Sequence, residues 1–97
     1  MARRTQRLAR DLRSLGEHVA GWRKVQGLTA AMVAERAGIT RDTLRAIENG
    51  DSSTTANLIS VLRVLGVFDT VADALDPLAS DFGRANADRL SRERVRT

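Results

Sequence analysis

Glycine residues divide the chain into short segments in which apolar residues recur every three or four positions. Gly27, Gly38, Gly50 and Gly66 each follow such a segment, and Pro77 follows the last one. Glycine closes helices readily because it adopts the left-handed conformation, and proline disfavours helical geometry in the residue before it. No segment alternates apolar and polar residues over the length of a strand. The pattern therefore predicts an all-α chain of short helices.

The first predicted helix carries one stripe of apolar residues. Their spacing of four, three, four and three residues places them on one helical face, and they are Leu8, Leu12, Leu15, Val19 and Trp22. We expect this helix to end near Gly27.

Two threonines are placed to cap the next two helices. Thr29 precedes a helix predicted over residues 30–37, and Thr40 precedes one predicted over residues 41–48. A threonine hydroxyl at this position accepts a hydrogen bond from a backbone amide of the first turn. The apolar side chains that we expect these helices to bury are Met32 and Val33 in the first and Leu44 and Ile47 in the second.

Two further helices and a tail complete the prediction. A fourth helix follows the small polar residues 51–55, and a fifth covers residues 68–75. The apolar residues of the fourth helix are Leu58, Val61, Leu62 and Leu65. Beyond Pro77, apolar residues stand isolated among polar ones, so residues 77–97 are predicted to be a tail with at most a short helix from about Asp81 to Arg94.

Composition narrows the possible classes of function. The chain has no cysteine and one histidine, so we expect no metal site and no cofactor. It also lacks a glycine-rich phosphate loop and an evident pair of carboxylates, and we do not expect an enzyme. The basic N-terminus is not followed by an unbroken apolar stretch, as a signal peptide or membrane span would be. We therefore expect a soluble, cytoplasmic protein.

Positive charge gathers at the two ends of the chain. Residues 1–24 carry seven basic and two acidic side chains, residues 25–83 carry four and eight, and residues 84–97 carry five and two. Of the 16 basic residues, 15 are arginine, which suits bidentate contact with phosphates but also follows from a GC-rich genome. We interpret the arginines before Leu15 as an exposed helical face, with contact to a DNA backbone as the alternative: Arg3, Arg4, Arg7, Arg10 and Arg13.

The second and third predicted helices satisfy the requirements of a helix-turn-helix. In that motif the second helix stands across the first and projects from the surface to enter a major groove. Ala34 is small where the two helices approach each other, and Gly38 permits a sharp turn between them. Ile39, Leu44 and Ile47 are expected to hold the second helix on the core.

Several motifs in this order resemble the phage Cro/CI-type (XRE) helix-turn-helix family. They are Leu15-Gly16-Glu17, Trp22-Arg23-Lys24, Gly27-Leu28-Thr29, Ala34-Glu35-Arg36-Ala37-Gly38-Ile39-Thr40 and Ile47-Glu48-Asn49-Gly50. The resemblance implies a five-helix phage-repressor-like domain, dimeric, that binds double-stranded DNA with two-fold half-sites and contacts bases through its third helix. It divides the chain into a basic N-terminal extension (1–14), the helix-turn-helix domain (15–76) and a C-terminal tail (77–97).

The resemblance also assigns site residues. Its base-reading positions fall on Arg41, Asp42 and Ala46, which can contact guanine, the cytosine amino group and a thymine methyl group respectively. The residues expected to contact the DNA backbone are Thr29, Thr40, Thr43, Arg45 and Asn49. Arg23 and Glu48 resemble a structural ion pair of the family.

Two positions depart from the family pattern. A glutamine common at the start of the second helix is Ala30 here, and a position that is often lysine is Asp51. Both departures weaken the expected affinity for phosphates.

The tail resembles a second kind of protein, the HipB-type antitoxins. The motifs are Asp76-Pro77-Leu78, Asp81-Phe82-Gly83-Arg84 and Arg94-Val95-Arg96. This resemblance implies a regulator that represses its own operon and neutralises a HipA-like serine/threonine kinase toxin. The alternatives are a stand-alone repressor without a toxin partner and a protein-interaction module with a helix-turn-helix fold.

Overall fold

A computed structural model describes residues 5–92 of the chain. Arg3 and Arg4, which belong to the basic N-terminal extension, lie outside the described residues. So do Arg94 and Arg96, which belong to the last of the antitoxin-like motifs. The described part is all-helical and contains no strand. Its elements are α1 (Gln6–Val25), α2 (Ala30–Ala37), α3 (Arg41–Glu48), α4 (Thr55–Leu65), α5 (Phe68–Leu75), η1 (Pro77–Ala79), α6 (Asp81–Ala85) and η2 (Ala87–Ser91).

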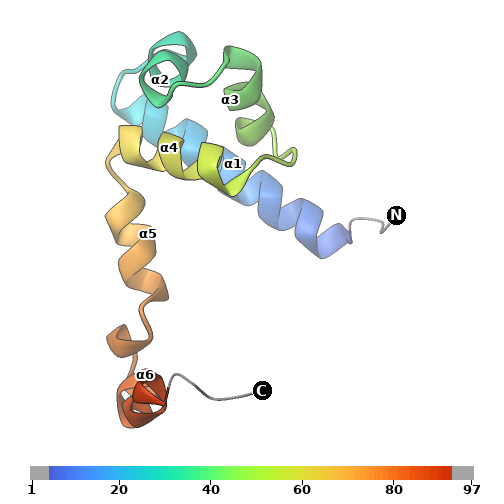
Figure 1. The fold of residues 1–97 in the computed structure, drawn as a ribbon. Helices are drawn as coiled ribbons and strands as arrows, with labels where there is room; N and C mark the ends of the chain where they lie inside the picture. The colour runs from blue at the N-terminus through green and yellow to red at the C-terminus, as the bar shows by residue number, and fades with distance from the viewer. Residues whose placement is uncertain (1–4, 93–97) are drawn as a thin grey trace.

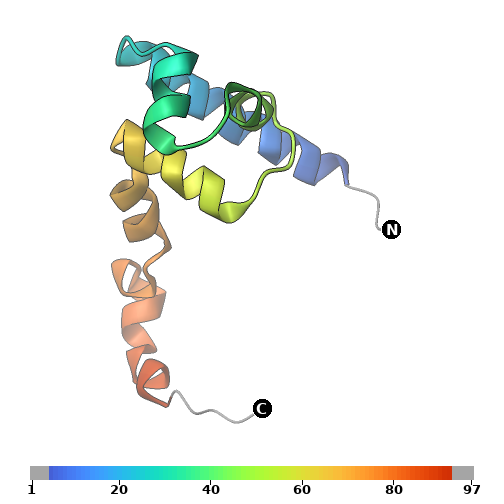
Figure 2. The same ribbon diagram turned by 45° about the horizontal axis from the view of Figure 1, so that its top comes forward.

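The helices form a bundle and an arm. Helices α1 to α4 pack together, whereas α5 and the elements after it run away from them (Figures 1 and 2). We call residues 68–92 the C-terminal arm. The arm makes the described chain elongated, with extents of 45 × 35 × 21 Å.

The ends of the short helices lie where the glycines and threonines predict them. The amide of Met32 donates to Thr29 Oγ1 at 3.1 Å, and the amide of Thr43 donates to Thr40 Oγ1 at 3.0 Å. At the other ends of α2 and α4, Gly38 and Gly66 adopt left-handed conformations with φ of 72° and 77°. The five predicted helices are confirmed as α1 to α5.

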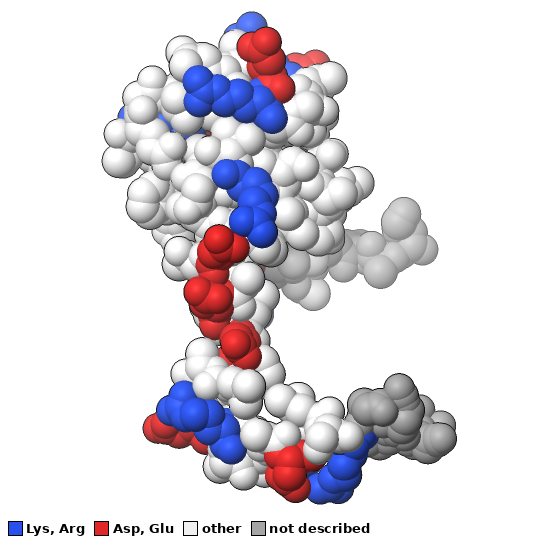
Figure 3. All heavy atoms as spheres, turned by 60° about the vertical axis from the view of Figure 1, so that its left-hand side comes forward, with Lys and Arg blue, Asp and Glu red and all other residues white. Residues whose placement is uncertain are grey.

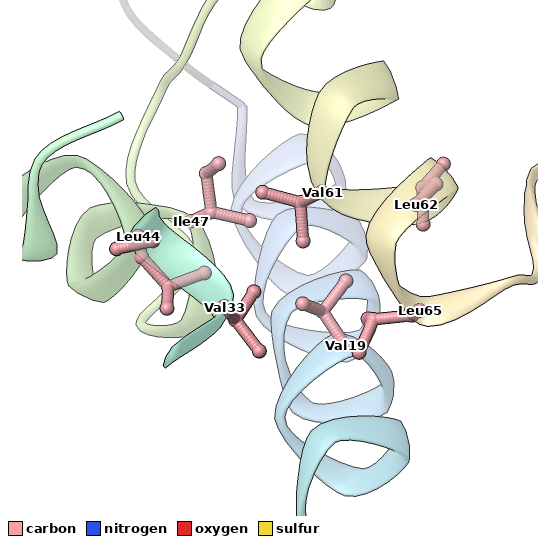
Figure 4. Packing of buried hydrophobic residues seen from close by; sticks show 8 residues of the cluster. Val19, Val33, Leu44, Ile47, Val61, Leu62 and Leu65 are labelled. Atoms are coloured by element: carbon pink, nitrogen blue, oxygen red, sulfur yellow. The ribbon is translucent and has the colours of Figure 1, made fainter. Parts of the chain in front are cut away.

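The core is aliphatic and takes side chains from all four helices of the bundle. Seven of its eight residues are labelled in Figure 4, where they point toward one another: Val19, Val33, Leu44, Ile47, Val61, Leu62 and Leu65, with Ala34 as the eighth. The predicted burial of Val33, Leu44 and Ile47 is confirmed. Met32 was expected to be buried and is exposed, because it precedes Val33 and is turned about 100° away around the helix.

The apolar stripe of α1 is only partly covered. Val19 is buried and Leu12 is half-buried, but Leu8, Leu15 and Trp22 are exposed. The N-terminal turns of α1 extend past the bundle, and α5 turns away from α1 instead of covering it (Figure 1). The predicted helix is confirmed, and its apolar stripe is buried only where the bundle covers it.

The predicted tail contains ordered helical turns. The amide of Leu78 donates to Asp76 Oδ1 at 2.9 Å, and the amide of Gly83 donates to Ser80 Oγ at 2.9 Å. Helix α6 begins at the expected Asp81 but ends at Ala85. No residue of α5, η1, α6 or η2 is buried, so local hydrogen bonds order this segment without a core of its own.

Candidate nucleic-acid interface

Helices α2 and α3 are joined by a tight turn. Gly38 closes α2, and the amide of Ile39 donates back to the carbonyl oxygen of Ala34 at 3.0 Å. Thr40 then caps α3, so two residues separate the end of α2 from the cap of the next helix. The turn leaves α2 and α3 at a steep angle to each other on one side of α1 (Figures 1 and 2). This is the arrangement that places a helix in a major groove.

The backbone of α3 approaches the backbone of α1 closely at Gly16. A Cβ atom added to Gly16 would lie 2.4 Å from the carbonyl oxygen of Ile47 and 2.6 Å from that of Glu48. Only glycine permits this approach without displacing a backbone, since these atoms belong to the last turn of α3. Gly16 belongs to the motif Leu15-Gly16-Glu17, but the sequence did not predict its contact with α3.

An ion pair holds the same end of α3. Arg23 Nε donates to Glu48 Oε2 at 2.8 Å, and Nη2 donates to Oε1 at 3.0 Å. A third donor of the guanidinium, Nη1, reaches the carbonyl oxygen of Leu28 at 3.1 Å. The side chains are 15% and 12% exposed, and the hydrogen bonds to Glu48 raise the pKa of Arg23. The pair thus links α1, the α1–α2 loop and α3.

The outer side of α3 is open to solvent. Arg41 is exposed and has no hydrogen-bond or ion-pair partner among residues 5–92. Asp42 accepts from Arg45 at 3.2 Å, but these side chains are 89% and 64% exposed, so their pairing is weak and exchangeable. Ala46 is half-buried on the same helix. The structure therefore brings the three predicted base-reading residues together on one short helix.

Of the residues predicted to contact phosphates, Arg45 lies in the middle of α3, and the others lie at or near the ends of α2 and α3. Thr29 and Thr40 cap the two helices, and the hydroxyls of Thr40 and Thr43 lie 2.9 Å apart. Thr29 Oγ1 accepts from an amide and keeps its own proton available as a donor, whereas one of the two hydroxyl protons of Thr40 and Thr43 is used in the hydrogen bond between them. Asn49 is exposed at the C-terminal end of α3. Thr40 and Asn49 therefore border α3 at its two ends, and Thr29 lies at the start of α2.

Arg13, one of the arginines of the N-terminal part of α1, lies beside the end of α3. A Cβ atom on Gly50, which follows α3 with φ of 85°, would lie 2.8 Å from the Cα atom of Arg13. The basic N-terminal part of α1 therefore lies directly beside the turn after α3. The sequence held no signal of this contact, because the two residues are far apart in the chain and belong to different helices.

The described residues contain neither a metal site nor a membrane span. No three acidic or histidine side chains in residues 5–92 are grouped so that they could hold a metal ion. None of the helices in this range combines the length and apolar character needed to cross a membrane.

Comparison with known proteins identifies the domain. Residues 21–67 match the family model described as helix-turn-helix. No curated protein and no solved structure matches the chain significantly. The matched range contains α2, the turn at Gly38, α3 and α4. Residues 21–67 are therefore a helix-turn-helix domain of the Cro/CI-type family of DNA-binding transcription regulators.

Proposed function

We propose that the chain is a cytoplasmic, sequence-specific repressor that binds operator DNA with α3 in the major groove. The observation that carries the proposal is the contrast between the two sides of α3. Its inner side is fixed by the contact with Gly16 and by the Arg23–Glu48 pair, whereas Arg41 on its outer side is exposed and unpaired among residues 5–92. A rigidly held helix with a free arginine at its start is suited to reading base edges.

The side chains of α3 divide into two roles. Arg41 donates to guanine O6 and N7, Asp42 accepts from a cytosine amino group after releasing Arg45, and Ala46 contacts a thymine methyl. Thr29, Thr40, Thr43, Arg45 and Asn49 contact phosphates and set the register of α3 in the groove.

The N-terminal part of α1 adds phosphate contacts. Arg7, Arg10 and Arg13 are exposed and have no partner among the described residues. Arg13 lies beside Gly50, at the turn that follows α3. The positive charge of Arg13 at this turn offsets the negative charge of Asp51, which follows Gly50.

Salt-dependent binding tests this proposal against a protein-interaction module of the same fold. The DNA upstream of the chain's own gene is labelled, and binding is followed by fluorescence anisotropy at increasing salt. We expect the logarithm of the binding constant to fall linearly with the logarithm of the salt concentration. The slope should be about −0.9 for each phosphate contact. Arg13→Gln should lower the slope by about one contact, whereas Arg89→Gln, which removes an exposed charge at the end of the arm, should not. Absence of binding to this DNA and to random DNA would support the interaction module.

The proposed repressor acts as a homodimer. One recognition helix reads only a few base pairs, and two copies related by a two-fold axis read half-sites about 34 Å apart. Helix α5 and the residues around Phe68 are the candidate interface.

A HipB-like antitoxin is a more specific form of the same proposal. It rests on the motifs at residues 76–78, 81–84 and 94–96, and the exposed apolar side chains of the C-terminal arm suit a protein partner. Purification from the native host, with identification of bound proteins and DNA, separates the two forms. A HipA-like kinase together with the promoter of the chain's own gene supports the antitoxin, and DNA without a stoichiometric protein partner supports the stand-alone repressor.

A further inference from the structure

The residues that end the recognition helix, Asn49 and Gly50, form a chemically reactive pair. Asn49 is the C-cap residue of α3, and its side chain is exposed. Gly50 has no side chain to hinder its backbone nitrogen. When this nitrogen attacks Cγ of Asn49, a bond forms between them, the bond from Cγ to the side-chain amide nitrogen breaks, and ammonia leaves. Water then opens the resulting imide ring at either carbonyl, which gives aspartate or isoaspartate at position 49.

The folded conformation blocks this attack. Asn49 has a ψ angle of −3°, so the Gly50 nitrogen eclipses the backbone nitrogen of Asn49 and is turned away from its Cβ atom. The Gly50 amide also donates to the carbonyl oxygen of Ile47 at 3.1 Å, and Gly50 is buried. The backbone must therefore rotate about ψ of Asn49, and this hydrogen bond must break, before the ring can close.

Contacts on both sides of Asn49 hold the end of α3 in the blocked conformation. The ion pair of Arg23 with Glu48, at 2.8 Å, ties the preceding residue to α1. On the other side, Gly50 lies against the backbone of Arg13. A helix end opens by local fluctuation without unfolding of the whole protein. The rate of reaction in the folded protein is thus set by the population of this open state, which the two contacts keep low.

The reaction changes the charge of the surface that we propose for DNA binding. Asn49 is assigned a phosphate contact, in which its side-chain amide acts as the donor. A carboxylate in its place has no proton to donate and repels the phosphate. Asp51, which follows Gly50, is already acidic, and the single charge of Arg13 beside this turn does not offset two carboxylates.

We propose that Asn49 is a site of deamidation, that opening of the last turn of α3 controls the rate, and that the modified protein releases DNA. Water is the only co-reactant. A bound operator slows the reaction, because its phosphate holds the Asn49 side chain. The effects on and of DNA binding rest on the proposed function, whereas the modification and its control by the fold do not.

Prolonged incubation of the full chain in mildly alkaline buffer tests the modification. Mass spectrometry with peptide fragmentation locates it, because replacement of an amide by a carboxylate raises the mass. Asn57 and Asn86 are internal controls, since leucine and alanine follow them and hinder the attack. We expect Asn49 to react faster than both in the native protein. In urea Asn49 should react at least about tenfold faster than in the folded chain, because opening breaks the hydrogen bonds of the last turn.

Two variants test the control by the fold. Glu48→Gln loosens the end of α3 and should speed the modification of Asn49 about tenfold. Gly16→Ala, which displaces the same turn, should act in the same direction. The matched control is Arg63→Gln, which removes the exposed pair with Asp69 at the start of the C-terminal arm, where acidic side chains gather (Figure 3). This control should react at the wild-type rate, and circular dichroism confirms that each variant is folded.

The substitution Asn49→Asp reproduces one product and tests the effect on DNA. It should bind DNA about tenfold or more weakly than the wild type, because a donor to a charged group is lost and a negative charge is added. Asn86→Asp adds the same charge to the C-terminal arm and should bind like the wild type.

Other results overturn the inference. These are a native protein in which Asn49 stays intact over weeks, reaction of Asn57 or Asn86 at the same rate, and wild-type rates in both Glu48→Gln and Gly16→Ala. Unchanged DNA binding by Asn49→Asp would refute the release of DNA. A wild-type protein that deamidates as expected but binds no DNA would refute the proposed function and leave the modification standing.

Discussion

Alanine substitutions at two glycines of α1 test the contact that positions the recognition helix. Gly21 lies in the same helix as Gly16, but nothing lies within 4 Å of a Cβ atom added there. Gly21→Ala should therefore stabilise the protein by about 1 kcal/mol, the difference in helix propensity. Gly16→Ala gains the same propensity but places a methyl group 2.4 and 2.6 Å from two carbonyl oxygens, whereas ordinary contacts begin at 3.4 Å.

The last turn of α3 must move by about 1 Å to admit this methyl group, because backbone carbonyls cannot rotate away as side chains do. Overpacking of this kind costs about 1–3 kcal/mol. With the upper value, which suits a backbone clash, the net destabilisation is about 2 kcal/mol after the gain of about 1 kcal/mol in propensity.

Thermal unfolding at equal protein concentration measures both variants. Since about 1 kcal/mol shifts the midpoint by about 4–8 °C in a domain of this size, Gly21→Ala should raise it by that amount and Gly16→Ala should lower it by about 8–16 °C. Gly16→Ala should also weaken operator binding, whereas Gly21→Ala should not. A Gly16→Ala protein as stable as the wild type would refute the close approach of α1 to α3.

Three further substitutions test the site. Arg41→Ala should cost about 1–3 kcal/mol on the operator and relax preference at one position in each half-site, as measured by anisotropy; an equal loss on random DNA would show that Arg41 contacts only phosphate. Glu48→Gln should destabilise the fold by at most about 3–5 kcal/mol, because it leaves the Arg23 guanidinium largely buried without its carboxylate partner. Urea unfolding measures this loss, and an unchanged free energy of unfolding would show that the pair does not stabilise the fold. Asp42→Ala should free Arg45 and lower selectivity for cytosine more than overall affinity, and unchanged selectivity in binding to single-substituted operators would assign Asp42 to helix stability alone.

Local chemistry explains why the short helices could be predicted from the sequence. Thr29 and Thr40 offer side-chain oxygens to free amides, and Gly38 and Gly66 adopt the left-handed conformation that other residues avoid. These effects act within a few residues of the chain. Both ends of α2, the start of α3 and the end of α4 therefore follow from the sequence without knowledge of the packing.

Packing between distant segments could not be predicted in the same way. Whether Leu15 and Trp22 are covered depends on the direction of α5, which follows from the left-handed Gly66 at the end of α4 and from the packing of Phe68 against the core. The contact of Arg13 with Gly50 depends on how α1 crosses the end of α3. For the candidate site, the sequence indicated which residues lie on α3, but not that Asp42 pairs with Arg45 while Arg41 stays unpaired.

Selection of bound sequences from a random DNA library tests the central claim most directly, because it assumes no operator. The account predicts enrichment of a two-fold symmetric site whose G·C-containing half-sites are centred about 34 Å apart, and loss of one enriched position per half-site in Arg41→Ala. A library that remains random after selection, with no salt-dependent binding of the protein to DNA, would contradict the account.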